Sequence, residues 1–222
     1  MTVAPVAIPL WADLAAVAIG SMQGAIFAAK VDNHRIDLLG VGVVGTATGL
    51  GGAFIRDILL NLSPAALTNN WYLPVAVIAS MVGMVLVRLI ARLEALWVVL
   101  DALTVGLYAA IGMTKALGIG LPLLPAMFVG VTAAVGGSAL RDMLLGQPVA
   151  MLKVGTLYAV AAVAGTIALA ASLACGASVH VAALVCAVVT TAMRMCAVWF
   201  GWSLPEQRSW TPSRRRASSS ST

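Results

Sequence analysis

The sequence predicts an all-α membrane protein with seven transmembrane helices, and three observations support this fold class. First, 61% of the 222 residues are apolar and 9% are charged, whereas a soluble domain is about 45–50% apolar and about 25% charged. Second, 13 basic and 8 acidic residues are too few to cover the surface of a soluble fold of this size. Third, the apolar residues form stretches of about 20, the length that crosses a hydrocarbon core. The high hydrophobicity also excludes an intrinsically disordered chain.

The apolar stretches are separated by short connections, which leave no room for a soluble domain. Seven segments fit membrane spans: 10–29, 36–60, 71–89, 95–114, 121–145, 152–173 and 179–202. After them, the polar segment 207–222 contains three consecutive arginines followed by a serine run. We predict that this segment is a disordered basic tail.

The basic residues predict the orientation of these spans, because cytoplasmic loops are enriched in lysine and arginine. Seven spans place the termini on opposite sides, and Lys115 is then the only basic loop residue on one side. The other side receives Lys30, Arg35, Arg88, Arg92, Lys153, Arg208 and Arg214 to Arg216. We therefore expect a multi-pass bacterial inner (plasma) membrane protein, with the N-terminus outside and the C-terminus in the cytoplasm, close to anionic membrane lipids.

Several function classes have no support in the sequence. The three cysteines form no CxxC motif and no metal-ligand spacing with either histidine, so we expect no metal site. No P-loop, GxSxG element or HExxH motif is present. We therefore predict neither an enzyme nor a cofactor, and the absence of a basic domain argues against nucleic acid as a partner.

The strongest signal is an internal repeat at an offset of 85 residues. The motif GG-x-x-x-R-D-x-L-L begins at Gly51 and recurs, without a gap, from Gly136. With a short gap in the preceding helix, Asp13 matches Asp101. Each copy holds three spans, and an odd number of spans reverses the direction of the chain across the membrane. The sequence therefore predicts two inverted three-helix repeats, a pattern typical of transport folds.

This repeat sets the expected domain organisation. We expect the first repeat over 10–92, the second, inverted repeat over 93–173, the seventh helix over 174–205 and the basic tail over 206–222.

Paired glycines lie near the middle of the second and fifth spans, at Gly51-Gly52 and Gly136-Gly137. Because adjacent glycines weaken a helix, we predict that both helices are kinked or broken there, with close packing as the alternative. Freed carbonyls, together with the nearby hydroxyls of Thr48 and Ser138, would suit a cation. For the spaced glycines Gly20/Gly24 and Gly45/Gly49, close helix packing is the preferred interpretation.

Charges inside the spans are costly, so each needs a partner or an aqueous path. Adjacent side chains do not face each other on a helix, which argues against Arg56–Asp57 as a pair. Depth and symmetry instead predict the pairs Arg56–Asp13 and Arg141–Asp101. Asp57 and Asp142 then remain as candidates for attracting a cation. The competing interpretation is that buried ion pairs simply hold the helices together.

Two further cations have open roles. Arg194 in the seventh span has no obvious partner and either snorkels to the interface or lines the path. Lys115 is best interpreted as an anchor at the outer interface.

The quoted motifs resemble the prokaryotic trimeric intracellular cation channel (TRIC) family. The resemblance rests on TATGLGGAFIRDILL (46–60), DALTVGLYAAIGMTKAL (101–117) and VGVTAAVGGSALRDMLL (129–145). It implies two three-helix units plus a seventh helix, a homotrimer with a pore in each subunit, and conduction of monovalent cations, chiefly potassium. It places the pore at the kinked second and fifth helices, which carry the glycine pairs, the two arginines and the two aspartates of the repeated motif.

The sequence also departs from the family pattern. Ala53 and Ser138 stand where a third glycine is usual, and Trp199 and Ser203 stand where basic residues are expected at the end of the seventh helix. Some similar bacterial sequences have been regarded as glycine transporters. A small-solute transporter and a membrane scaffold without transport activity therefore stay open beside the channel.

Overall fold

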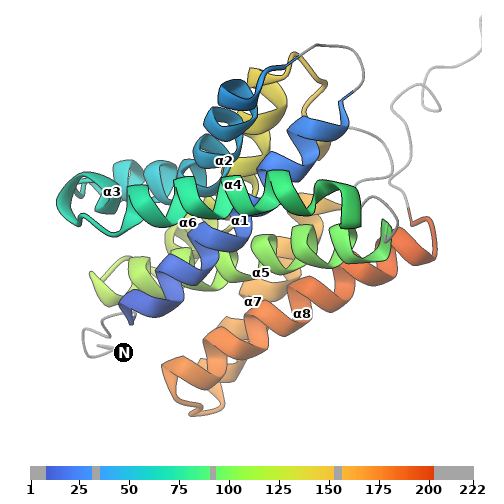
Figure 1. Cartoon of the computed structure of the whole chain (residues 1–222). Helices are drawn as coiled ribbons and strands as arrows, with labels where there is room; N and C mark the ends of the chain where they lie inside the picture. Colours follow the sequence, from blue (N-terminus) through green and yellow to red (C-terminus); the bar gives the residue numbers. More distant parts are fainter. Residues whose placement is uncertain (1–8, 32–35, 91–93, 153–156, 203–222) are drawn as a thin grey trace, which may run out of the picture.

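The computed structural model describes residues 9–31, 36–90, 94–152 and 157–202, and in these ranges every regular element is helical. The predicted basic tail, and with it Arg35, Arg92 and Lys153, lies outside the described residues. Figure 1 shows the helices packed into one bundle. The elements are α1 (Leu10–Lys30), α2 (Leu38–Leu59), α3 (Ala65–Thr68), α4 (Tyr72–Ile90), α5 (Glu94–Gly118), α6 (Leu123–Leu144), the 3-10 turn η1 (Ala150–Leu152), α7 (Tyr158–Ala174) and α8 (Val179–Trp199).

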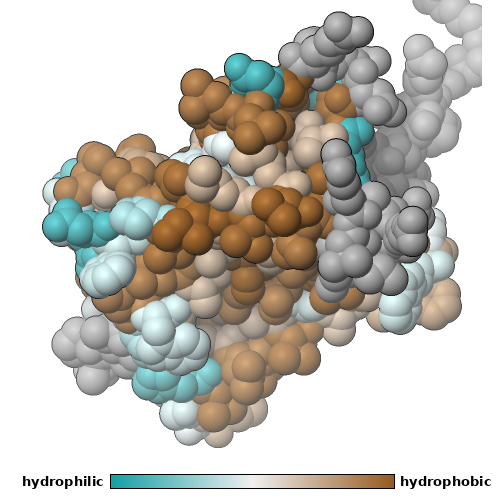
Figure 2. Space-filling view, in the orientation of Figure 1, coloured by the Kyte–Doolittle hydropathy of each residue, from teal (hydrophilic) through white to brown (hydrophobic). Residues whose placement is uncertain are grey.

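Each of the seven predicted spans contains one long helix. By length and hydropathy, α1, α2, α6, α8 and the stretch Trp97–Gly118 of α5 can cross a membrane, whereas the apolar stretches Tyr72–Val87 and Tyr158–Ala174 are shorter. The chain is thus a multi-pass membrane protein, and the number of seven crossings stays a prediction. Many large apolar side chains are exposed on the outside of the bundle, and apolar residues form most of the surface in Figure 2.

Small residues allow the helices to approach closely. A Cβ added at Gly24 would lie 2.4 Å from the Thr48 hydroxyl, and one at Gly45 would lie 2.6 Å from the Ser80 hydroxyl. These contacts confirm the packing interpretation of the spaced glycines. Interfaces of this kind are common between membrane helices, because dispersion contacts replace the hydrophobic effect in lipid.

The seventh long helix, α8, packs against both α5 and α7, and Figure 1 shows it along the edge of the bundle beside them. In the first half of the chain, α4 packs directly on α1. The equivalent contact in the second half is between α5 and α7, and there α8 lies against both helices. This additional helix brings Arg194 into the bundle.

Candidate functional site

The glycine pairs bring α2 and α6 into backbone contact. A Cβ added at Gly52 would lie 2.5 Å from the Ala133 carbonyl oxygen, and one at Gly137 would lie 2.4 Å from the Thr48 carbonyl oxygen. Gly137 follows Gly52 by the repeat offset of 85 residues, and Ala133 follows Thr48 by the same offset, so the two contacts are equivalent. A Cβ on Gly51 would lie 3.3 Å from the Gly137 Cα. No ion can pass between the two backbones at this point.

Both helices run through their glycine pairs without interruption. The expected break is therefore wrong, because each glycine keeps its helical conformation. The absence of a side chain instead lets the facing helix approach closely. A bend without a break stays a prediction. The carbonyls around Gly51 and Gly136 remain inside continuous helices, so no turn is opened there for a cation.

The first charged cluster surrounds Arg56 of α2, which is fully buried. Its Nη1 and Nη2 donate to the two oxygens of Asp13 at 2.9 and 3.1 Å, which confirms the Arg56–Asp13 pair. The Tyr72 hydroxyl donates to the same carboxylate at 2.7 Å. Such a fork-to-carboxylate geometry is the strongest form of hydrogen-bonded ion pair.

The expectation that Arg56 avoids Asp57 is wrong. Arg56 Nε lies 2.8 Å from Asp57 Oδ1, because a guanidinium carries five donors and can serve two carboxylates at once. The helix spacing rule concerns the direction of the side chains, and a long arginine can curl back to its neighbour.

Asp57 is bound from two further directions. Lys115 Nζ, on α5, lies 2.7 Å from Oδ1, and the backbone N–H of Ala65 donates to Oδ2 at 2.9 Å. Lys115 is therefore an ion-pair partner of a buried aspartate, and an interface anchor is not its only role. The α3 turn that supplies the Ala65 N–H has no hydrophobic period, so sequence reasoning missed it.

The second cluster, around Arg141 of α6, repeats part of this arrangement. Arg141 donates to Asp142 Oδ1 from Nε and Nη2 at 2.9 and 2.8 Å, and Ala150 N–H donates to Oδ2 at 2.7 Å. Arg141 Nη1, however, lies 3.9 Å from Asp101 Oδ1, too far for a hydrogen bond. The predicted Arg141–Asp101 pair is thus an ion pair without a hydrogen bond, and here too the adjacent aspartate is the direct partner.

Other groups occupy Asp101 instead. Gln23 Nε2, from α1, donates to Oδ1 at 3.0 Å, and Arg194 Nη2 donates to Oδ2 at 3.2 Å. The Tyr158 hydroxyl also donates to Oδ2, as Tyr72 does to Asp13. Arg194 therefore has the partner that the sequence did not indicate. Gln23 and the two tyrosines were missed, although a lone glutamine inside a span was a detectable signal.

The remaining candidate residues lie apart from the carboxylates. Thr48 and Ser138 turn their hydroxyls back to their own helices, bonding the carbonyls of Val44 at 2.6 Å and Val135 at 2.9 Å. No group of three or more potential metal ligands occurs among the described residues.

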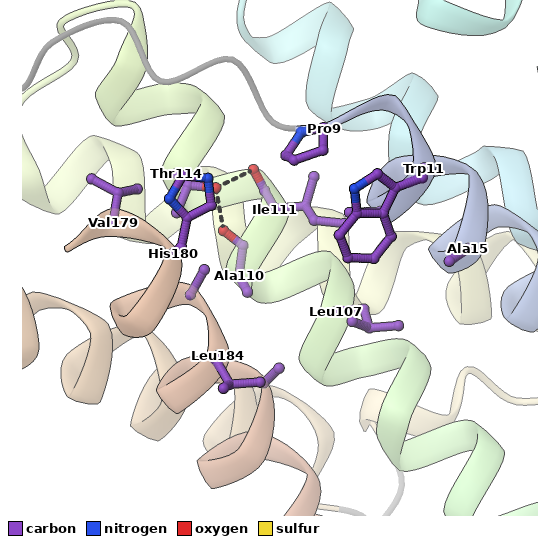
Figure 3. A pocket seen from close by; sticks show the side chains of 13 residues that line it. Pro9, Trp11, Ala15, Leu107, Ala110, Ile111, Thr114, Val179, His180 and Leu184 are labelled. Carbon is purple, nitrogen blue, oxygen red and sulfur yellow. Dashed lines mark hydrogen bonds between the residues drawn. The ribbon is translucent and has the colours of Figure 1, made fainter.

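The cavities on the described part of the bundle include the following two. One, of about 350 Å³, lies between α1, α5 and α8, and its walls are apolar; Figure 3 shows Trp11, His180 and Leu184 around it. Thr114 in its wall bonds the Ala110 and Ile111 carbonyls of its own helix, so this cavity suits hydrocarbon rather than a hydrated ion. The other, of about 430 Å³, adjoins the second charged cluster.

The chain is similar in sequence to a known family and to several bacterial membrane proteins. A family model described as "Glycine transporter" matches residues 10–88 and 98–174. The UPF0126 inner membrane protein YadS of Escherichia coli K12 is 33% identical over 199 residues, which cover 88% of this chain and 94% of that protein. A UPF0126 membrane protein of Deinococcus radiodurans is 34% identical over 157 residues, covering 70% of this chain and 72% of that protein.

Solved structures share the fold. One, from work described as "Structural basis for conductance through TRIC cation channels", matches with a TM-score of 0.79 at 28% identity, covering 90% of this chain and 98% of that chain. The trimeric intracellular cation channel orthologue from Rhodobacter sphaeroides matches with a TM-score of 0.78 at 26% identity, covering 86% and 97%.

Proposed function

Because the chain belongs to the prokaryotic TRIC family and to the family described as "Glycine transporter", we propose that it is a potassium-conducting cation channel. Each subunit of a homotrimer would hold its own pore, in the bacterial inner membrane. The observation that carries this proposal is the shared fold, at a TM-score of 0.79, with a structure described in terms of conductance through TRIC cation channels.

The proposed pathway follows α2 and α6. The backbone contact at Gly52 and Gly137 closes this pathway near its middle. The buried clusters around Arg56 and Arg141 lie beyond this contact, one on each side of it. Conduction therefore needs the two helices to separate. Each cluster pairs two cations with two aspartates and carries no net formal charge. It would therefore hold a cation only weakly, which a channel needs for release.

The architecture that supports this pathway is a pair of inverted repeats, 10–92 and 93–173, followed by the seventh helix, with the N-terminus outside and the C-terminus in the cytoplasm. Equivalent contacts in the two halves favour the repeat: Asp57 and Asp142 each accept a backbone N–H eight residues later. The proposed function is passive, and it requires neither an enzymatic step nor a cofactor.

Recordings from planar lipid bilayers test the proposal. Purified protein is expected to give discrete unitary currents in potassium solutions, which disappear when a large organic cation replaces potassium. Arg141→Gln is expected to change the current size or its voltage dependence, because one charge moved across the full field corresponds to about 2.3 kcal/mol per 100 mV. Absence of currents from an intact, folded trimer would refute the channel.

The second candidate function is a small-solute transporter of the glycine type, which the description of the matching family favours. It predicts saturable uptake of labelled glycine into proteoliposomes without discrete currents. A folded trimer that shows neither currents nor uptake would leave a scaffold role.

A further inference from the structure

The cavity beside the second charged cluster is lined by charged and aromatic side chains as well as apolar ones. It lies among α5, α6, α7 and α8, and its lining includes Trp97, Arg141, Tyr158 and Arg194. Gln147 and Gly201, which follow the C-terminal ends of α6 and α8, also line it. The cavity therefore reaches the ends of two long helices, where a transmembrane helix meets the lipid headgroups.

Three of these lining side chains carry a buried N–H that has no acceptor. In the part of the chain that the structure describes, Arg141 Nη1, Arg194 Nε and Trp97 Nε1 make no hydrogen bond. Both arginines are almost fully buried, at 1% and 4% exposure. An unmet donor on a buried charged group is costly, so three of them beside one cavity indicate a missing acceptor.

The acidic side chains nearby do not fill this role. Asp142 already accepts from Arg141 and from the Ala150 N–H. Asp101 accepts from Gln23, Tyr158 and Arg194. With two arginines and two aspartates, the cluster has no net formal charge, and its unused hydrogen-bonding capacity consists of donors.

Aromatic rings hold both guanidinium groups in place. Arg141 lies over the Phe27 ring at 3.9 Å, and Arg194 lies over the Tyr158 ring at 3.7 Å. Phe27 in turn stacks on Trp97 with ring centroids 5.9 Å apart. The donors of α5, α6 and α8 are therefore preorganised.

We propose that this cavity binds a phosphate group, supplied either by the headgroup of an anionic phospholipid or by free inorganic phosphate. A tetrahedral phosphate can accept from donors on three helices at once, and guanidinium–phosphate bonds are among the strong, charge-assisted kind. Binding here does not depend on conduction.

Binding to the full-length protein in a neutral maltoside detergent tests this site. The probes are short-chain phosphatidylglycerol, phosphatidylcholine with the same chains, and inorganic phosphate, and the measurement is the shift of the unfolding temperature with probe concentration. We expect saturable binding of phosphatidylglycerol, of inorganic phosphate or of both, and none of phosphatidylcholine beyond a detergent-like effect. Phosphatidylglycerol alone identifies a lipid source, and inorganic phosphate alone identifies a free one.

Two substitutions remove donors from the site. Trp97→Phe keeps a ring and removes one N–H, so it should weaken binding about tenfold, as expected for one hydrogen bond to a charged group. Arg194→Lys keeps the charge but replaces the guanidinium and its Nε donor with an ammonium, and it should weaken binding at least about tenfold. The matched control is Lys115→Met, which removes a cation from the first cluster and should leave the affinity unchanged.

Several results would overturn the site. They are no saturable binding to folded wild-type protein, unchanged affinity in Trp97→Phe, or an equal loss in Lys115→Met. Binding of glycine in competition with phosphate would also overturn it, because the site would then recognise the carboxylate of a transported solute. If Arg194→Lys fails to fold, the Trp97→Phe result decides alone. The assay contains no ion gradient, so its failure leaves the channel proposal untouched.

Discussion

The two charged clusters have the same composition but are bonded differently. Each contains two aspartates, an arginine from the repeated motif, a tyrosine and a second cation. In the first cluster, the second cation is Lys115, which binds the aspartate of the motif; in the second it is Arg194, which binds Asp101 instead. Arg56 consequently holds Asp13 at 2.9 Å, whereas Arg141 stands 3.9 Å from Asp101.

This difference follows from the position of α8. Because α8 packs on α5 and α7, its arginine reaches the carboxylate that would otherwise be free for Arg141. The first cluster thus joins α1 and α2 to α5 through Lys115, and the second joins α5 and α6 to α8 through Arg194 and to α1 through Gln23. A duplicated motif acquired two different roles through the helices that surround each copy.

The largest expected effects come from removing a shared carboxylate from either cluster. Asp13→Asn leaves Arg56 buried with Asp57 as its remaining carboxylate partner, and should lower the free energy of unfolding by about 3–5 kcal/mol. Asp101→Asn should cost more, because it removes the carboxylate that the buried Arg194 binds, whereas Arg56 keeps Asp57 after Asp13→Asn. Unfolding midpoints in a denaturing detergent titration measure both. Equal losses would show that the two clusters are energetically the same.

The glycine contact between α2 and α6 should be symmetric where the clusters are not. Gly52→Ala and Gly137→Ala each bring a Cβ against a carbonyl of the facing helix, and each should cost about 1–3 kcal/mol by overpacking. Gly42→Ala, also in α2, is the matched control, because no atom lies within 4 Å of its Cβ position. The same unfolding titration applies, and a large difference between the two contact variants would contradict their equivalence.

A pair of double-mutant cycles sharpens the comparison of the ion pairs. The coupling between Arg56 and Asp13 should be about 1.5–3 kcal/mol, as for hydrogen bonds to charged groups. The coupling between Arg141 and Asp101 should lie below about 1 kcal/mol, since no hydrogen bond joins them. Methionine and asparagine are suitable replacements, and reversed magnitudes would refute the assignment of roles.

Much of this arrangement was predictable, because it follows from the spacing of the apolar segments and from the offset of the internal repeat. The positions of the seven long helices came from hydropathy, and the Arg56–Asp13 pair came from the repeat and from depth. The weak bonding of Arg141 was not predictable, because it depends on which helix packs beside α5, and sequence does not indicate that Arg194 and Gln23 reach Asp101. Likewise, the α3 turn that binds Asp57 has too few residues to show a period.

The glycine pairs illustrate a second limit of sequence reasoning. Gly51-Gly52 is compatible with both a weakened helix and a close contact, because both need a missing side chain, and the sequence pattern favours the weakened helix. The deciding factor is a facing backbone from a helix 85 residues away, which only the folded chain supplies.

A further, small effect tests a departure from symmetry at the contact between α2 and α6. Tyr108 of α5 is buried, and its hydroxyl donates to the Gly49 carbonyl oxygen, one turn before the glycine pair of α2. The offset of 88 residues that relates Asp13 to Asp101 also relates Gly20 to Tyr108. Gly20 has no side chain that could make an equivalent hydrogen bond. Tyr108→Phe removes one hydrogen bond between membrane helices and should cost about 0.6–1.7 kcal/mol. If Tyr108 holds α2 in the closed position, the variant should also raise the open probability of single channels, while the unitary current stays the same. A stability loss without any change in opening would assign the bond to packing alone, and the pore would then open by moving α6.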